Sequence, residues 1–367
     1  MRKIFNLLKK IILTFNNNLN YIYVNSVLKK EYIKNLYLRK KEKSLIGVID
    51  NISHTPTFVN LEFLIYLKSM NYKNNYLLIF PFGNKIKTLY KKNDNFVKNT
   101  NDLRFKTILE PSIDLVQNFK KNVIFFANRY EGINFFKEKK KNDLILPVGA
   151  SIFYVSKVNY NESFILKYLR NYKLTKKRVL LRSPEVYQQI LKKNINFKID
   201  EKIVTISLKE AHYNNARNSK INEWLKFASF LEKKKYRVIL IPDITSLTKN
   251  SLVFKKLKNF EVNELAAYDI RIRLALYENS FLNFSTSSGT NTLLFNSEAN
   301  YLIFSVYNEK IKYGTGSYDL WLRHTGIKYG NQFPFATTTQ KIIWKKNNEN
   351  FTTIKTEFLK FEKLYKK

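Results

Sequence analysis

Apolar and polar residues alternate along the chain in two recurring patterns. Short, nearly continuous apolar runs are typical of strands buried on both faces, whereas apolar residues three or four positions apart indicate helices. In the first half, these patterns predict strands at residues 44–50, 75–80, 122–127 and 143–148 and helices at residues 58–70, 154–171 and 185–193. In the second half, they predict strands at residues 202–208, 236–241, 281–284 and 301–305 and helices at residues 222–233, 263–278, from about 290, and 351–364.

This order of elements predicts an α/β protein with two Rossmann-like domains that face each other across a cleft. A polar stretch rich in Lys and Asn, residues 192–202, is expected to link the halves. The expected domain ranges are 1–43, 44–195, 196–350 and 351–367, of which the last is a C-terminal helix. Within helix 263–278, Asp269 and Arg273 are four residues apart and can form a pair, while Arg271 is expected at the surface, with a position in the cleft as the alternative.

The basic N-terminal segment, residues 1–43, is expected to be helical, with an apolar stripe from Phe5 to Phe15 flanked by Lys9 and Lys10. It contains no apolar run of the roughly 20 residues that span a bilayer, and no cleavage site that would indicate a signal peptide. Two interpretations remain open: a helix at the membrane interface, or a helix packed on the first domain.

Composition excludes several classes of function. The 367 residues contain no Cys, which excludes disulfides, thiolate metal sites and a cysteine nucleophile. The net charge of +36 is compatible with nucleic acid as a partner. However, Lys, Asn, Ile, Phe and Tyr all have A/T-rich codons, the basic residues are spread along the whole chain, and no RNA-binding aromatic signature or zinc finger is present. We therefore expect no specific nucleic-acid partner, and we keep a basic nucleic-acid-binding protein as an alternative.

Two loops are predicted to leave the carboxyl ends of strands in the second domain. The first follows strand 202–208 and contains Lys209, His212, Arg217, Asn218 and Ser219, the last two of which are expected to cap the next helix. Ligands of parallel sheets bind at this edge, and a basic loop before a helix suits an anion such as a diphosphate.

The second loop follows strand 281–284 and contains Ser287, Ser288, Gly289 and Thr290. Glycine permits close approach of the backbone, and Thr290 is expected to cap the helix that follows. An ordinary capped turn is the alternative. Both loops are expected at the same sheet edge, where together they predict a phosphate site.

In the first half, residues that follow strands are candidates for a general base. His54 follows the first strand, and Glu131 follows the strand at 122–127. An ordinary polar role is the alternative for His54, and Glu131 is the competing candidate for the base. Asp-x-Asp, G-x-G-x-x-G, Walker and G-x-S-x-G motifs are absent from the sequence, and with three His and no Cys we expect no metal site and no cofactor.

The second half resembles a family of bacterial glycosyltransferases that are found with surface-polysaccharide genes and have a GT-B-like architecture. The resemblance covers roughly residues 202–345 and is carried by Leu208–Tyr213, Arg217–Ser219, Pro242–Asp243, Arg273–Glu278, Ser287–Gly289 and Gln340–Trp344. Family members usually have Arg where this chain has Lys209, and Lys keeps the charge but lacks the bidentate fork.

The resemblance implies a glycosyltransferase that uses a nucleotide-activated sugar, with the donor in the C-terminal domain and a cell-surface glycan or lipid-linked acceptor on the side of the N-terminal domain. Lys209, His212, Arg217 and the 287–290 loop would contact the donor phosphates. The expected location is the cytoplasm, with peripheral binding to the inner face of the cytoplasmic membrane left open. A GT-B-like protein that binds sugar nucleotides without catalysis is the second alternative.

Overall fold

The computed structural model describes residues 44–50, 57–72, 74–80, 103–116, 122–126, 131, 135, 143–146, 163–198, 200–210, 215–247, 252–308, 310–311, 316–345 and 348–365. The chain divides into two compact units. The first comprises residues 1–60, 70–105 and 116–160, and the second comprises residues 61–69, 106–115 and 161–367. The second unit thus includes residues 161–195, which the sequence assigned to the first domain. The N-terminal segment 1–43 lies outside the described residues.

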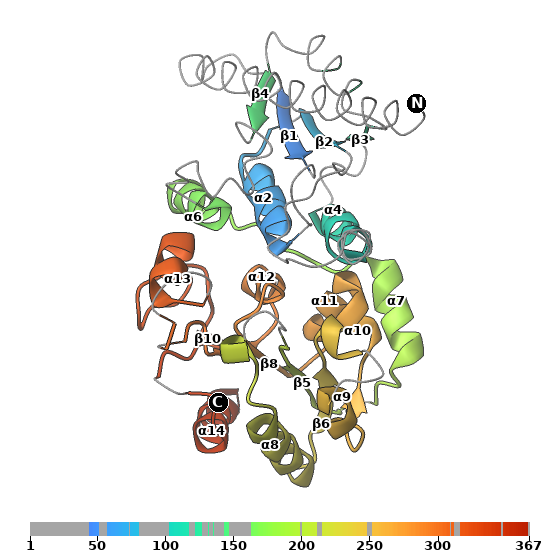
Figure 1. Ribbon diagram of the computed structural model, residues 1–367, viewed down its shortest axis with the longest axis vertical. Coiled ribbons are helices and arrows are strands. Elements are labelled where there is room, and N and C mark those ends of the chain that lie inside the picture. The colour runs from blue at the N-terminus through green and yellow to red at the C-terminus, as the bar shows by residue number, and fades with distance from the viewer. Residues whose placement is uncertain are drawn as a thin grey trace, which may run out of the picture. The chain divides into compact units, whose positions relative to one another are not determined.

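The first unit contains a four-stranded parallel sheet (Figure 1). Its strands are β1 (Ser44–Asp50), β2 (Asn74–Phe80), β3 (Val123–Phe125) and β4 (Asp143–Leu146), in the spatial order β3-β2-β1-β4. Leu45, Ile46, Val48 and Ile49 of β1 are buried, as expected for a parallel strand covered on both faces.

The second unit contains a six-stranded parallel sheet. Its strands are β5 (Ile203–Ser207), β6 (Arg237–Ile241), β7 (Glu261–Val262), β8 (Leu282–Thr286), β9 (Tyr301–Phe304) and β10 (Gln340–Ile342). The spatial order β10-β9-β8-β5-β6-β7 is the doubly wound order 3-2-1-4-5-6 of a Rossmann fold, read from the other edge. The predicted α/β class with two Rossmann-like units is therefore confirmed. The predicted cleft between them stays a prediction.

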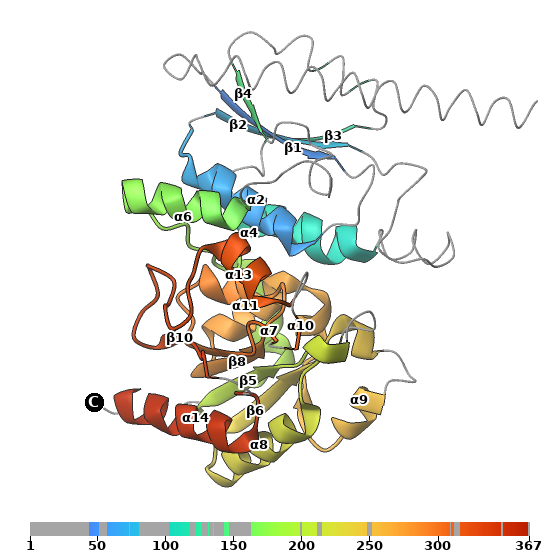
Figure 2. The same cartoon turned by 60° about the vertical axis from the view of Figure 1, so that its left-hand side comes forward.

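Helices connect these strands (Figures 1 and 2). They are α2 (Phe58–Ser69), α4 (Glu110–Val116), α6 (Phe164–Thr175), α7 (Glu185–Asn194), α8 (Ile221–Lys233), α9 (Leu252–Lys256), α10 (Leu265–Tyr268), α11 (Ile270–Glu278), α12 (Asn291–Phe295), α13 (Tyr318–Thr325) and α14 (Phe351–Tyr365). In the second unit, α8 and α14 lie on one side of the sheet and α11 and α12 lie on the other (Figure 1).

Alternate residues of β5 point to the two faces of the sheet. Val204 and Ile206 belong to an apolar core that includes Trp224 and Phe227 of α8 and Phe358 of α14. On the opposite face, Thr205 Oγ1 lies 2.5 Å from Asn283 Oδ1, and the Ser207 hydroxyl lies 2.7 Å from the Tyr277 hydroxyl of α11. Period-two alternation thus places a buried polar layer beneath α11, where each hydroxyl has a partner.

Helices α8 and α14 cap each other. The Lys220 N–H and Trp224 Nε1 both donate to Glu349 Oε1, at 2.8 and 2.5 Å, and the Phe351 N–H donates to Glu223 Oε2 at 2.9 Å. The expectation that Asn218 and Ser219 cap α8 is therefore wrong. Lys220 occupies the N-cap position without a side-chain cap, and a carboxylate that is distant in sequence lies at this helix end instead.

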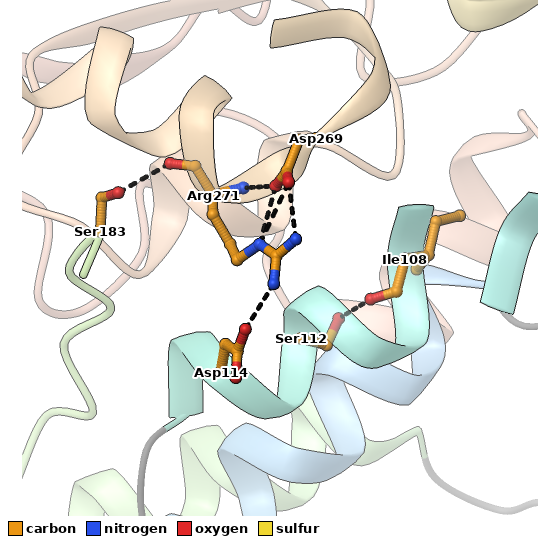
Figure 3. Close-up of polar contacts among 6 residues, drawn as sticks. All are labelled: Ile108, Ser112, Asp114, Ser183, Asp269 and Arg271. Carbon is orange, nitrogen blue, oxygen red and sulfur yellow. Dashed lines mark hydrogen bonds and ion pairs between the residues drawn. The ribbon is translucent and has the colours of Figure 1, made fainter. Parts of the chain in front are cut away.

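The predicted helix 263–278 is two helices, because the chain turns out of helical geometry at Asp269, with φ −116° and ψ 114°. The Asp269 carboxylate accepts the Arg271 N–H at the start of α11 and also pairs with the Arg271 side chain (Figure 3). The expected pair of Asp269 with Arg273 is therefore wrong. Arg273 is buried and its Nε donates to the Ala266 carbonyl at 2.7 Å.

Arg271 is not the surface residue that the sequence suggested. Its guanidinium pairs with Asp114 of α4 as well as with Asp269 (Figure 3), and it stacks on the Tyr187 ring, 4.2 Å from the centroid. Only 14% of the Arg271 side chain is exposed. Arg271 therefore joins α4, α7 and α11 within the second unit.

Candidate functional site

The candidate site lies where the strand order of the second sheet reverses. β5 pairs with β6 on one side and with β8 on the other, so the chain leaves the sheet in opposite directions after these two strands. Ligands of open parallel sheets bind at the carboxyl ends of the strands at such a switch point. The two loops predicted to bind phosphate follow β5 and β8, and so both begin at this point.

Ser219 joins the two ends of the first loop to the end of β8. Its Oγ accepts the Lys209 N–H at 2.8 Å, its own N–H donates to the Lys209 carbonyl at 3.0 Å, and its hydroxyl lies 2.9 Å from the Thr286 hydroxyl. Ser219 is buried. These bonds close the loop at its base and hold it against β8.

Lys209 provides a second bond between the loops. Its Nζ donates to the Ser287 carbonyl at 2.8 Å, and the residue is only 6% exposed. Burial, followed by the nearby Arg217, lowers the pKa of Lys209 to about 7, while Asp243 and Glu349 act in the opposite direction. An anion placed beside Lys209 would restore its charge at neutral pH.

The turn after β8 is held by Asn291. Asn291 Oδ1 accepts the Ser285 hydroxyl at 2.6 Å, and its Nδ2 donates to the Thr286 carbonyl at 3.0 Å. The Ser288 and Thr290 hydroxyls lie 2.6 Å apart, and Thr290 occupies the N-cap position of α12 without a side-chain cap, which corrects the expected capping role.

The backbone of this turn offers donors. Among the described residues, no acceptor lies within hydrogen-bond distance of the Ser288, Gly289 or Thr290 N–H. Gly289 is exposed, and Ser287, Ser288 and Thr290 are half-buried. Successive N–H groups without protein acceptors are suited to bind phosphate oxygens.

Arg217 ends a short 3₁₀ turn, Asn215–Arg217, in the first loop and is half-buried. The Asn308 side chain, from the loop after β9, donates to the Ala216 carbonyl, and the Asn308 N–H donates to the Gly316 carbonyl at 2.8 Å. A Cβ at Gly316, whose φ is +101°, would lie 2.9 Å from Arg217 Cδ. The backbone at Gly316 thus contacts the Arg217 side chain closely.

Acidic residues near the site offset part of the positive charge of Lys209 and Arg217. Asp243, which follows β6, accepts the Glu210 N–H at 3.4 Å, so it fixes the start of the first loop. The pKa of the Glu349 carboxyl is raised, mainly by burial. Since Glu349 already accepts the Lys220 N–H, the N-terminus of α8 is not the anion site that the sequence suggested. Among the described residues near the site, the donors without a protein acceptor are the backbone N–H groups of the turn after β8.

The remaining predicted site residues are placed as follows. His54 and His212 lie outside the described residues, and Glu131 is exposed in the first unit. Among described residues, no group of three or more His, Asp or Glu could hold a metal ion. None of the described helices is long and apolar enough to cross a bilayer.

One ionisable pair was missed from the sequence. His324 Nε2 of α13 lies 3.0 Å from Glu62 Oε2 in α2, although the residues are far apart along the chain. No local spacing links them. The only available signal was the scarcity of histidine, with three in the chain.

No family model matches the chain, and no curated protein matches it. Solved structures similar to it include a glycosyl transferase family 9 protein from Veillonella parvula, with TM-score 0.44, 10% identity and coverage of 87% of this chain and 90% of that one. They also include E. coli ADP-heptose LPS heptosyltransferase II, with TM-score 0.44, 9% identity and coverage of 88% and 100%. Another is the iron-containing dodecameric glycosyltransferase TibC from enterotoxigenic E. coli, with TM-score 0.45, 12% identity and coverage of 89% and 77%. Because these TM-scores are below 0.5, the site described here depends on this chain's own residues alone.

Proposed function

We propose that the chain is a glycosyltransferase that moves a sugar from a nucleotide-activated donor to a cell-surface glycan or lipid-linked acceptor. The observation that supports this most is the pair of loops at the β5/β8 switch point, joined by Lys209 and Ser219, with backbone N–H donors on one loop and Arg217 on the other. Diphosphates match this set of donors because their oxygens accept several N–H bonds and form bidentate contacts with a guanidinium.

In this proposal the donor diphosphate lies at the turn 287–290. The Ser288, Gly289 and Thr290 N–H groups and the Arg217 guanidinium bind its oxygens, and Lys209 holds the turn and adds charge as its proton is regained. Donors already in place stabilise the negative charge that develops on the leaving diphosphate. The proposed transfer uses no metal and no cofactor, and His212 is a further candidate for the donor phosphates.

The acceptor is proposed to bind on the side of the first unit, where His54 or Glu131 would take the proton from its hydroxyl. The proposed location is the cytoplasm, with peripheral binding to the inner face of the cytoplasmic membrane. An acceptor on a lipid carrier would require contact with that surface. No specific nucleic-acid partner is proposed.

A binding assay tests the proposal. Thermal stabilisation is measured for the full chain against UDP-, GDP-, ADP-, CDP- and dTDP-sugars, with Arg217→Ala and Ser288→Ala beside the wild type. Arg182→Ala is the matched control, because Arg182 pairs with Glu298 and its side chain is 69% exposed. We expect one nucleotide class to stabilise the wild type and the control, and to stabilise Arg217→Ala much less.

Two results would contradict the proposal. If Arg217→Ala responds like the wild type, the donor does not bind at these loops; Ser288→Ala keeps its backbone N–H and should respond like the wild type. If no sugar nucleotide stabilises the chain while RNA or DNA binds with strong dependence on salt, the basic charge serves nucleic acid instead. Binding of a donor without transfer to any acceptor would favour the non-catalytic alternative.

A further inference from the structure

Glu62 and His324 form an ion pair that is largely shielded from water within the second unit. His324 Nε2 lies 3.0 Å from Glu62 Oε2 and 3.1 Å from Oε1, and the Glu62 side chain is 10% exposed. Glu62 Oε2 is buried and accepts no hydrogen bond among the described residues. A buried carboxylate oxygen of this kind is stabilised mainly by a cation, so Glu62 favours the imidazolium form of His324.

The second ring nitrogen of His324, Nδ1, does not contact Glu62. No described residue forms a hydrogen bond with Nδ1, and about a third of the side chain, 35%, is exposed. A histidine with one nitrogen on a carboxylate and the other open has the orientation required to act on a substrate group.

The pair is connected to the turn that is proposed to bind the diphosphate. The Thr292 hydroxyl lies 3.5 Å from Glu62 Oε1, and the Thr292 N–H donates to the Gly289 carbonyl at 3.1 Å. Only Thr292 therefore separates the carboxylate from the turn 287–290. On the other side, the Ser163 hydroxyl, at the start of α6, donates to the His324 carbonyl and holds the end of α13.

The charge next to His324 favours the protonated imidazolium. Glu62 raises the pKa of His324, and its attraction outweighs the opposing effect of burial. Lys68 is the basic residue of α2, and Lys167 is the first basic residue of α6 after Ser163. On α13 itself, Asp319 and Arg323 pair with each other in the solvent. The imidazolium is therefore the expected form near neutral pH.

We propose that His324, oriented and charged by Glu62, is a catalytic residue that binds the leaving diphosphate through Nδ1–H. This inference rests on the proposed function and adds a donor to the same site. In the transfer, the acceptor oxygen bonds to the anomeric carbon as its proton passes to the base. The bond from that carbon to the diphosphate oxygen breaks, and its electron pair stays on the diphosphate. The Nδ1–H bond to that diphosphate strengthens as the charge grows, and no proton leaves His324.

If the Glu62–His324 pair only stabilised the fold, its removal would have a different effect from that of removing a residue that binds the diphosphate. A helix-to-helix ion pair would affect the thermal midpoint and leave ligand preference unchanged. A residue that stabilises the leaving diphosphate must favour the free nucleoside diphosphate, which has one more negative charge, over its sugar ester. The ratio of the two dissociation constants is therefore the measurement that separates the two roles.

The experiment uses calorimetry on the full chain with UDP, ADP, GDP and CDP and with the glucose esters UDP-, ADP-, GDP- and CDP-glucose. His324→Gln and Glu62→Gln are compared with Asp319→Asn, a matched control that removes the exposed pair on the same helix, where Asp319 is 58% exposed. We expect His324→Gln to lose about tenfold of the wild-type preference for the nucleoside diphosphate, the usual effect of one charge-assisted hydrogen bond. Asp319→Asn should keep that preference.

Histidine NMR provides a readout that needs neither activity nor a stable His324 variant. The chain has three histidines, so His54→Gln and His212→Gln assign the third resonance by elimination. We expect the pKa of His324 to exceed 6.5, to fall in Glu62→Gln and to rise when the nucleoside diphosphate binds.

The outcomes are distinguishable. If the nucleoside diphosphate binds, loses affinity in Arg217→Ala, and neither shifts the His324 resonance nor discriminates between wild type and His324→Gln, this inference is overturned and the proposed function stands. If no nucleotide binds the wild type, the proposed function fails and this inference fails with it.

Discussion

Lys209→Met should change how the stability of the fold depends on pH. In the folded chain the pKa of Lys209 is lowered from 10.5 to about 7, mainly by burial. The unfolded chain therefore binds more protons than the folded chain between these two values, and wild-type stability rises with pH across this window. Met removes the titrating group and also the bond to the Ser287 carbonyl.

The magnitude follows from the pKa difference. At 1.36 kcal/mol per pKa unit, placing the full charge on buried Lys209 costs about 5 kcal/mol, a cost present below pH 7 and absent above pH 10.5. Between pH 7 and 9, the wild type should gain about 2 kcal/mol in free energy of unfolding relative to Lys209→Met. Common titrations of the other lysines cancel in this difference.

Urea denaturation of both proteins at a series of pH values measures this gain. Lys360→Met is the control, because Lys360 pairs with Glu357 at the surface with its side chain 63% exposed. It should show no such slope. A stability difference between wild type and Lys209→Met that stays constant from pH 7 to 9 would refute the conclusion that Lys209 is buried with a lowered pKa.

Three further predictions concern Glu349, Glu278 and Gly316. Glu349→Ala should lower the free energy of unfolding by about 2–3 kcal/mol, measured by urea denaturation, because it leaves the Lys220 N–H and Trp224 Nε1 without their acceptor. Burial raises the pKa of Glu278 to about 7, so the folded chain holds the extra proton from pH 4.5 to 7, and the wild type should lose stability relative to Glu278→Gln between pH 5 and 8. Gly316→Ala should weaken nucleoside diphosphate binding by about tenfold in calorimetry, because its Cβ would displace Arg217.

Matched variants separate these effects from general damage. Glu357→Ala, which removes the pair with the exposed Lys360 on α14, should cost little. Gly330→Ala places a Cβ at φ +83° with no heavy atom within 4 Å, so it adds the backbone strain of Gly316→Ala without contacting Arg217. If both glycine variants weaken binding equally, the contact with Arg217 does not matter. A stability difference between wild type and Glu278→Gln that is the same at pH 5 and pH 8 would show that the pKa of Glu278 is not raised.

The sheets were predictable because most of their strands are short, largely apolar runs. The predicted strand 202–208 is β5 at Ile203–Ser207, and the predicted strand 236–241 is β6 at Arg237–Ile241. Short elements at the edge, β7 and β10, were missed because two or three residues produce no periodic signal. The break at Asp269 was also missed, because apolar spacing continues across it while the aspartate side chain bonds locally to the backbone.

The positions of the two site loops were predictable because they depend on local sequence. Both loops were placed at strand ends, and the β5–β8 pairing brings these ends together. Roles that depend on residues distant in the sequence were not predictable. Glu349, not Ser219, bonds the Lys220 N–H at the start of α8, and Ser219 is used to hold the loop base to Thr286. Sequence spacing has no information about such contacts, because tertiary packing brings them together.

The most direct test of the proposed diphosphate site is a crystal structure with the nucleoside diphosphate that stabilises the chain most. We expect phosphate oxygens about 2.7–3.1 Å from the Ser288–Thr290 N–H groups, with the Arg217 guanidinium on the same diphosphate. A nucleotide bound away from the carboxyl ends of β5 and β8 would contradict the proposed site.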